Sequence, residues 1–93
     1  MIQINEYFGG QVRSLGYQTA DGKATVGVML PGTYQFNTGQ MEIVTIMEGR
    51  MLVKLAGEDQ FYPFELTESF EVPAHSSFEV QIESPTSYLC QFR

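Results

Sequence analysis

The sequence predicts an all-β jelly roll, and three features of the chain support that fold. Short runs of β-branched and aromatic residues recur about every ten positions, and Gly, Pro, Asn and Asp separate them. No stretch shows the apolar periodicity of a helix. A chain of 93 residues has room for one domain, so residues 1–93 should fold as a single unit. Because an open sheet would expose its edges, we expect a closed barrel or two facing sheets.

Four strands are expected before residue 40, and turn residues separate them. Gly9-Gly10 ends the first strand, and Asp21-Gly22 joins the second and third as a pair. Pro31-Gly32 breaks the chain sharply before the fourth. The expected ranges are 2–8, 12–17, 24–30 and 34–38.

The stretch 41–55 is predicted to be a β-hairpin that turns at Glu48-Gly49-Arg50. Strand side chains alternate between faces, so Glu42, Val44 and Ile46 project together. This places one carboxylate on an otherwise apolar face, where an ionised group is costly unless it is paired. We therefore expect this face to line the inside of the barrel and Glu42 to serve a ligand.

Four more strands complete the predicted fold. Pro63 confines its strand to a sheet edge or an irregular stretch, because proline cannot donate to a ladder. Residues 77–83 alternate apolar and polar side chains, which is typical of a strand with one buried face. A tight corner at 74–76 precedes this strand. The expected ranges are 61–65, 70–72, 77–83 and 86–92.

The charge of the chain excludes one class of partner. The net charge is −6, and only five cations are present. Five scattered cations cannot form the basic patch that grips a phosphate backbone, so we expect no nucleic acid polymer as a partner. A small phosphate-bearing ligand needs only one or two cations and backbone amides, and it stays possible.

The single cysteine and the terminal sequence indicate the cellular setting. Cys90 excludes an intrachain disulfide and a thiolate metal site, and in an apolar strand a buried, inert thiol is favoured over a nucleophile. The first residues lack the features of a signal peptide, and no apolar run approaches the ~20 residues of a membrane helix. We expect a cytoplasmic protein with no membrane partner, and a homodimer, which would stabilise so short a chain.

Two stretches of the chain resemble the motifs of the cupins. Glu42, followed by six residues and Gly49, matches the end of the first motif, G-x5-H-x-H-x3,4-E-x6-G. Pro73 matches the proline of the second, G-x5-P-x-G-x2-H-x3-N, whereas Thr67 stands at its leading glycine. The metal histidines are replaced by Phe36 and Thr38, or Gln35 and Asn37, and by Phe78. The resemblance implies a cupin-type jelly-roll barrel without a metal.

A closer resemblance, from Asn5 to Phe92, is to the small cupin-fold pyrimidine/purine nucleoside phosphorylases. It implies broad phosphorolysis of nucleosides to the free base and ribose 1-phosphate, with phosphate as co-substrate and no cofactor. Thr33 replaces an expected glutamate and Gln91 an expected arginine, which puts substrate range or phosphate affinity in question. Five positions depart from the pattern in all: Thr33, Met41, Phe61, Thr67 and Gln91. The matching stretches are 5–8, 26–29, Gly32-x-Tyr34-x-Phe36-x-Thr38, Glu42, Phe70-x-Val72-Pro73-x-His75-Ser76-x-Phe78, and 86–90.

Phosphorolysis needs a group that stabilises a cationic sugar, and Glu42 is the catalytic candidate. The alternative is a partly buried glutamate held by a tyrosine or a backbone amide. An isolated acid inside a barrel is rare, which favours the catalytic interpretation.

The remaining site candidates each have a plain structural alternative. Four aromatic residues could stack on a base, or form ordinary core. Thr38 could bind a sugar or phosphate, or end a strand. His75 could protonate a leaving base or bind phosphate, although a surface turn histidine is the simpler explanation. The aromatic candidates are Tyr34, Phe36, Phe78 and Tyr88.

Phosphate requires a cation, and the candidates are Arg13, Lys23 and Arg50, each of which could instead be a solvated surface charge. Two rival functions stay open. A non-catalytic, metal-free cupin could bind a sugar or nucleoside as a sensor. A metal-dependent cupin enzyme is disfavoured, because the histidines it needs are missing.

Overall fold

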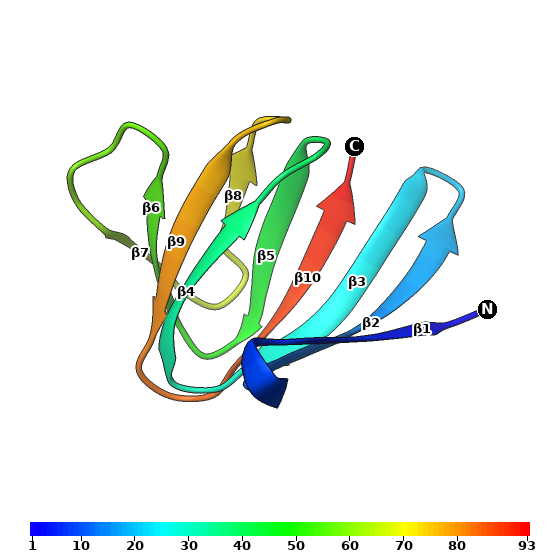
Figure 1. Cartoon of the computed structure of the whole chain (residues 1–93), viewed down its shortest axis with the longest axis horizontal. Helices are drawn as coiled ribbons and strands as arrows, with labels where there is room; N and C mark the ends of the chain where they lie inside the picture. Colours follow the sequence, from blue (N-terminus) through cyan, green and yellow to red (C-terminus); the bar gives the residue numbers. More distant parts are fainter.

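The computed structural model describes all residues, 1–93, and shows a chain built of β-strands. Two sheets face one another (Figure 1). Their strand orders are β1-β2-β3-β10-β5-β8 and β4-β9-β6-β7, with every pair antiparallel. One 3₁₀ turn, η1 (Phe8–Gly10), interrupts the strands. The strands are β1 (Gln3–Tyr7), β2 (Val12–Thr19), β3 (Gly22–Met29), β4 (Gly32–Asn37), β5 (Glu42–Glu48), β6 (Met51–Leu55), β7 (Tyr62–Phe64), β8 (Ser69–Val72), β9 (Ser77–Ile82) and β10 (Thr86–Phe92).

The predicted all-β jelly roll is confirmed, in its double-sheet form. No strand belongs to both sheets, so hydrogen bonding does not close them into a barrel. The Asp21-Gly22 pair joins β2 to β3, with Thr19 and Gly22 as the terminal partners. Pro63 lies in β7, at the edge of the four-stranded sheet, where its missing N–H does not interrupt a second ladder.

The predicted hairpin over 41–55 is wrong, because β5 and β6 do not pair. Both edges of β5 are occupied, by β10 and β8, whereas β6 pairs with β9 and β7. The chain therefore crosses between the sheets at Gly49, which adopts a φ of +99°. Thr86 fixes this corner: its hydroxyl accepts a hydrogen bond from the Arg50 N–H (3.1 Å) and lies 3.0 Å from the Arg50 carbonyl oxygen.

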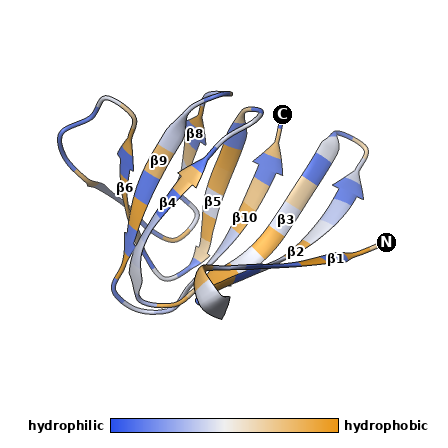
Figure 2. Cartoon of the chain, in the orientation of Figure 1, coloured by the Kyte–Doolittle hydropathy of each residue, from blue (hydrophilic) through white to orange (hydrophobic).

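Alternating side chains from both sheets form the core between them. Val44 and Ile46 of β5 point inward, as predicted, and meet Met51 and Val53 of β6 across the interior. Hydrophobic stretches lie within the strands, whereas the loop from β6 to β7 is largely hydrophilic (Figure 2). The structure contains no helix of the length and apolar character needed to cross a membrane.

Thr67 has an unusual backbone conformation for its residue type. It lies between β7 and β8 with a φ of +69°, in the left-handed region that β-branched residues avoid. Its N–H donates to the carbonyl oxygen of Ile46 at 2.8 Å, which holds the turn against β5. Thr67 stands where the cupin motif has glycine, so the structure gives a physical reason for a glycine at this position.

Candidate functional site

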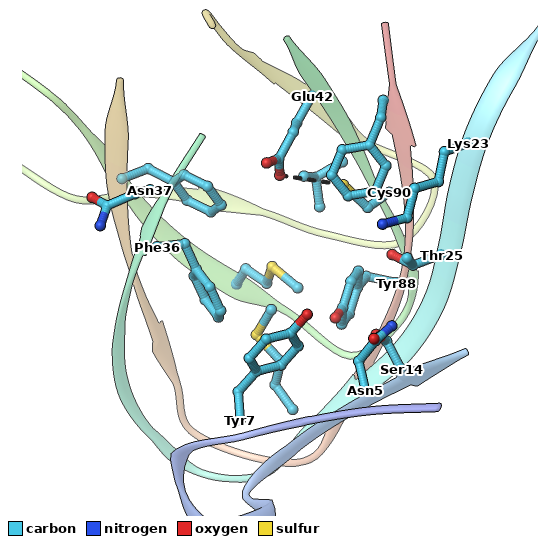
Figure 3. A pocket seen from close by; sticks show the side chains of 15 residues that line it. Asn5, Tyr7, Ser14, Lys23, Thr25, Phe36, Asn37, Glu42, Tyr88 and Cys90 are labelled. Atoms are coloured by element: carbon cyan, nitrogen blue, oxygen red, sulfur yellow. Dashed lines mark hydrogen bonds between the residues drawn. The ribbon is translucent and has the colours of Figure 1, made fainter. Parts of the chain in front are cut away.

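A cavity of about 230 Å³ lies between the two sheets and is walled mainly by hydrophobic side chains (Figure 3). Residues of β1, β2, β3, β5 and β10 contribute one side, and residues of β4, β6 and β9 contribute the other. The alternation of strand side chains explains why most lining residues are two positions apart, with Phe36 and Asn37 as adjacent exceptions. Polar groups gather in two regions of the cavity, which are described below as its charged end and its neutral end.

Glu42 and Lys23 form the charged end. Glu42 is half-buried on β5, and its Oε1 accepts a hydrogen bond from the Cys90 thiol on β10, with an Sγ–Oε1 distance of 3.3 Å. Burial raises the pKa of the Glu42 carboxyl, while the Cys90 thiol and the charge of Lys23 oppose that rise. The carboxylate therefore points into the interior, as the alternation predicts, and is held by one neighbour.

Lys23 is the cation that the fold brings to this cavity. It projects from β3, and its Nζ lies 5.1 Å from the centroid of the Phe92 ring. Phe92 pairs in register with Glu42, so the acid and the ammonium flank one aromatic side chain. This places a positive and a negative group at the same end of the cavity.

The other two phosphate candidates lie outside the cavity. Arg13 points to the outer face of β2, where it is exposed and lies 3.3 Å from Glu6. Arg50 is exposed in the corner between β5 and β6, 3.4 Å from Glu83. Each is paired at the surface with a carboxylate.

Three of the four predicted aromatic residues line the cavity. Phe36 of β4 and Phe78 of β9 stack with ring centroids 5.4 Å apart, and Tyr88 of β10 contributes to the opposite wall. Tyr34 is buried outside the lining, where its hydroxyl donates to the Leu30 carbonyl oxygen at 2.6 Å. Its place in the structure is that of a core residue that ties β4 to the preceding turn.

Thr38 and His75 also lie outside the lining. The Thr38 hydroxyl donates to the Pro73 carbonyl oxygen (2.6 Å) and accepts from the Ser76 N–H (2.9 Å). It thereby ties the end of β4 to the turn between β8 and β9. His75 occupies that turn, is exposed and has a φ of +55°. The contacts of Thr38 fit a residue that ends a strand, and the exposure of His75 fits a surface turn histidine.

Four neutral polar side chains form the other end of the cavity: those of Asn5, Tyr7, Ser14 and Tyr88. The Asn5 amide nitrogen donates to the Ser14 hydroxyl at 3.2 Å. Burial, with smaller contributions from Cys90 and Tyr7, raises the pKa of the Tyr88 phenol, so this group stays protonated. The neutral end therefore offers donors and acceptors without a charge.

Gly27 makes room for this neutral end. A Cβ atom at this position would lie 2.8 Å from the Tyr88 hydroxyl and 2.6 Å from the Arg13 carbonyl oxygen. Any side chain at residue 27 would displace the phenol or the neighbouring strand. Asn5 and Ser14 were not predicted as site residues, because their meeting inside the cavity depends on the pairing of β1 with β2.

Cys90 is buried, as predicted, and it is also part of the cavity wall. Burial, followed by the nearby Glu42 carboxylate, raises the pKa of the thiol well above its usual range, so the sulfur is a weak donor and not a thiolate. No group of three or more His, Cys, Asp or Glu side chains is arranged to hold a metal ion.

Relatives of known sequence match the chain over its whole length. A family model described as "Pyrimidine/purine nucleoside phosphorylase" matches residues 2–92. A protein of that name from Aeromonas hydrophila is 47% identical over 92 residues, which cover 99% of this chain and 98% of the relative. Another of that name, from Magnetococcus marinus, is 48% identical over 92 residues, 99% of each chain.

Solved structures share the fold. A Vibrio parahaemolyticus protein described as of unknown function superposes with a TM-score of 0.94 at 43% identity, covering 97% of this chain and 96% of that one. A cupin superfamily protein from Desulfitobacterium hafniense superposes with a TM-score of 0.72 at 16% identity, covering 96% and 80%. The second likeness establishes the cupin fold.

Proposed function

The chain belongs to the pyrimidine/purine nucleoside phosphorylase family, and we propose on that premise that its cavity exchanges the base of a nucleoside for phosphate. The observation that carries the proposal is that Glu42 and Lys23 both lie at one end of a cavity walled by aromatic side chains. The substrates are purine and pyrimidine nucleosides with inorganic phosphate, and the reaction is a pentosyl (glycosyl) transfer.

The reaction breaks the C1′–N bond, whose electron pair stays on the base, and the base takes up the proton that the attacking phosphate gives up. A phosphate oxygen forms the new bond to C1′ and gives ribose 1-phosphate. The sugar carries positive charge as the old bond breaks before the new one is complete. Groups fixed beside C1′ can supply most of the rate enhancement by positioning and by electrostatic stabilisation.

Glu42 and Lys23 suit the two halves of this step. The Glu42 carboxylate stabilises the cationic sugar or binds its hydroxyls, in a desolvated site where such an interaction is strengthened. The Lys23 ammonium holds the phosphate beside C1′, and its flexible stem allows it to follow the phosphate during transfer. Phe36, Phe78 and Tyr88 present ring faces and edges that accept any base by stacking.

The proposed reaction uses no metal and no cofactor. Its support is the replacement of the metal histidines of the cupin motif by Phe36 and Thr38, or Gln35 and Asn37, and by Phe78. Activity that survives dialysis against a chelator, with less than stoichiometric transition metal by elemental analysis, is the expected result. Loss of activity that a metal restores would contradict the metal-free reaction.

The direct test incubates purified protein with uridine or inosine, with and without phosphate, and measures free base and ribose 1-phosphate. Phosphate-dependent release of base is the expected result. Release without phosphate would identify a hydrolase. Absence of release for every nucleoside, with binding retained in calorimetry, would identify a non-catalytic sensor.

A homodimer is also proposed, through the outer face of the six-stranded sheet. Ile4, Leu15, Val26 and Leu89 lie side by side in register on that face, and Ile4 and Leu15 are 80% and 44% exposed. Such a row can pack on its own copy about a two-fold axis. Leu15→Glu should convert a dimer to a monomer in light scattering, and a wild-type monomer at micromolar concentration would contradict the proposal.

A cytoplasmic location is proposed on the strength of the free thiol. Cys90 lies in the cavity wall beside Glu42, where oxidation would add bulk and charge to the site. A reducing compartment keeps such a thiol intact. Fractionation of cells that express the chain, with enzyme activity as the readout, tests this location.

A further inference from the structure

The two polar ends of the cavity are separated along the strands. Asn5 pairs in register with Ser14, and Tyr88 continues the same row across the sheet on β10. Phe92, four residues further along β10, pairs with Glu42. At about 3.3 Å per residue, the neutral and charged rows are about 13 Å apart. Figure 3 shows Asn5 and Ser14 on the side of the cavity away from Glu42.

This arrangement suits different parts of a nucleoside to different ends of the cavity. If phosphate and ribose bind beside Lys23 and Glu42, the base extends toward the neutral end. The edges of nucleobases carry uncharged donors and acceptors, and the groups at the neutral end are of the same kind. The aromatic walls contact the faces of the base and leave its edge to the polar side chains.

The Asn5 amide has a property that the hydroxyl groups lack. It presents a donor and an acceptor side by side, so it can form two hydrogen bonds to one base edge. In the structure its nitrogen donates to the Ser14 hydroxyl, which uses one of the two amide N–H bonds. Because a hydroxyl both donates and accepts, Ser14 can support the amide equally well after it rotates by half a turn.

We propose that Asn5 is a specificity-determining residue that reads the edge of the base in either amide orientation, supported by Ser14. This inference rests on the proposed phosphorolysis and names the side chain that gives the reaction its broad range of nucleoside substrates. In one orientation the amide matches the N–H and carbonyl of uridine or inosine. In the other it matches the ring nitrogen and amino group of cytidine or adenosine. One side chain thus serves both classes of base without a second site.

The test combines a change in the enzyme with a change in the substrate. Kcat/KM is measured for uridine, cytidine and 2-pyrimidinone riboside, which lacks the exocyclic group of both, with wild type and Asn5→Leu. Intrinsic leaving-group differences between the substrates cancel when the two proteins are compared, because both are assayed with the same three substrates. For uridine and for cytidine, the ratio of kcat/KM to that of 2-pyrimidinone riboside should be about tenfold higher in wild type than in Asn5→Leu. The ratio that remains in Asn5→Leu should reflect only the leaving-group chemistry of the substrates.

Asn37→Leu is the matched control. Asn37 also lines the cavity, but its amide points away from the interior in Figure 3, so the substrate preference should be that of wild type. Asn5→Ala replaces Asn5→Leu if circular dichroism shows that the latter is unfolded. An unchanged preference in a folded Asn5 variant would overturn the inference while leaving the phosphorolysis intact. Absence of phosphate-dependent release in wild type would instead defeat the proposed function itself.

Discussion

Cys90 and Glu42 are joined by a hydrogen bond from Sγ to Oε1 of 3.3 Å, which connects the adjacent strands β10 and β5 inside the cavity. A thiol is a weak donor, so it orients the carboxylate without neutralising it. Burial meanwhile makes ionisation of Glu42 less favourable. The acid is therefore held in place at a position where its charge is costly to the fold.

Glu42→Gln should fold normally and lose most turnover, by about 10²-fold or more, because the amide cannot stabilise a cationic sugar. Phosphate-dependent base release at saturating substrate measures the loss. Glu48→Gln, an exposed change at the far end of β5, is the control and should retain the wild-type rate. Full turnover in Glu42→Gln would remove the acid from the mechanism.

The same variant should be more stable than wild type at neutral pH. A pKa that burial raises in the folded state means that the ionised form is penalised there, relative to the unfolded chain. The gain from Glu42→Gln should be complete above the folded-state pKa and should disappear as the pH falls below the ordinary glutamate pKa. Urea denaturation at pH 7 and pH 4 tests this, and an equal difference at both would contradict it.

Cys90→Ala should shift the acidic limb of the pH–rate profile to higher pH. The thiol lowers the pKa of Glu42, so its removal makes this carboxylate ionise at a higher pH. Cys90→Ser keeps a hydrogen-bond donor at this position, so its acidic limb should lie at the wild-type pH or at a lower pH. Profiles of kcat/KM over pH that coincide for all three proteins would show that the hydrogen bond has no such effect.

Lys23→Met should raise the KM for phosphate by at least about tenfold, because it removes the cation of the charged end while keeping its apolar length. Arg13→Met and Arg50→Met serve as controls and should leave this KM unchanged, since both arginines pair with surface carboxylates. Steady-state rates with phosphate varied at fixed nucleoside give the constants. A selective rise in either arginine variant would move the phosphate site away from Lys23.

Thr67→Gly should stabilise the protein by about 1 kcal/mol, because it relieves a β-branched residue held at a φ of +69°. The added freedom of glycine in the unfolded chain offsets part of that gain. Thr33→Gly, in the extended strand β4, provides the contrast and should destabilise by about 0.5–1 kcal/mol. Urea midpoints of the two variants should therefore lie on opposite sides of the wild-type value.

The sequence predicted the strands well because alternation is a local property. The inward direction of Glu42 followed from Val44 and Ile46 on the same face, and both are buried. Pairing is not local: the run before Gly49 and the run after it look like a hairpin, yet their partners come from elsewhere in the chain. A short turn between two β runs fits a hairpin and a crossing between sheets equally well.

The same limit applied to the site. Sequence spacing could not rank the three cations, since only the fold places Lys23 inside and Arg13 on the outer face of the sheet. Asn5 and Ser14 are nine positions apart and meet only because β1 pairs with β2. Tyr34 and Phe36 share a strand face, but the cavity reaches only the second.

The place of β10 in the larger sheet constrains when that sheet can assemble during synthesis. It lies between β3 and β5, both of which precede it in the chain, and it is the link that joins β1, β2 and β3 to β5 and β8. During synthesis the two halves of the sheet stay separate until the ribosome releases residues 86–92. A nascent chain stalled before that point holds only part of the cavity and exposes strand edges, so chaperone binding should be greatest just before residues 86–92 emerge from the ribosome.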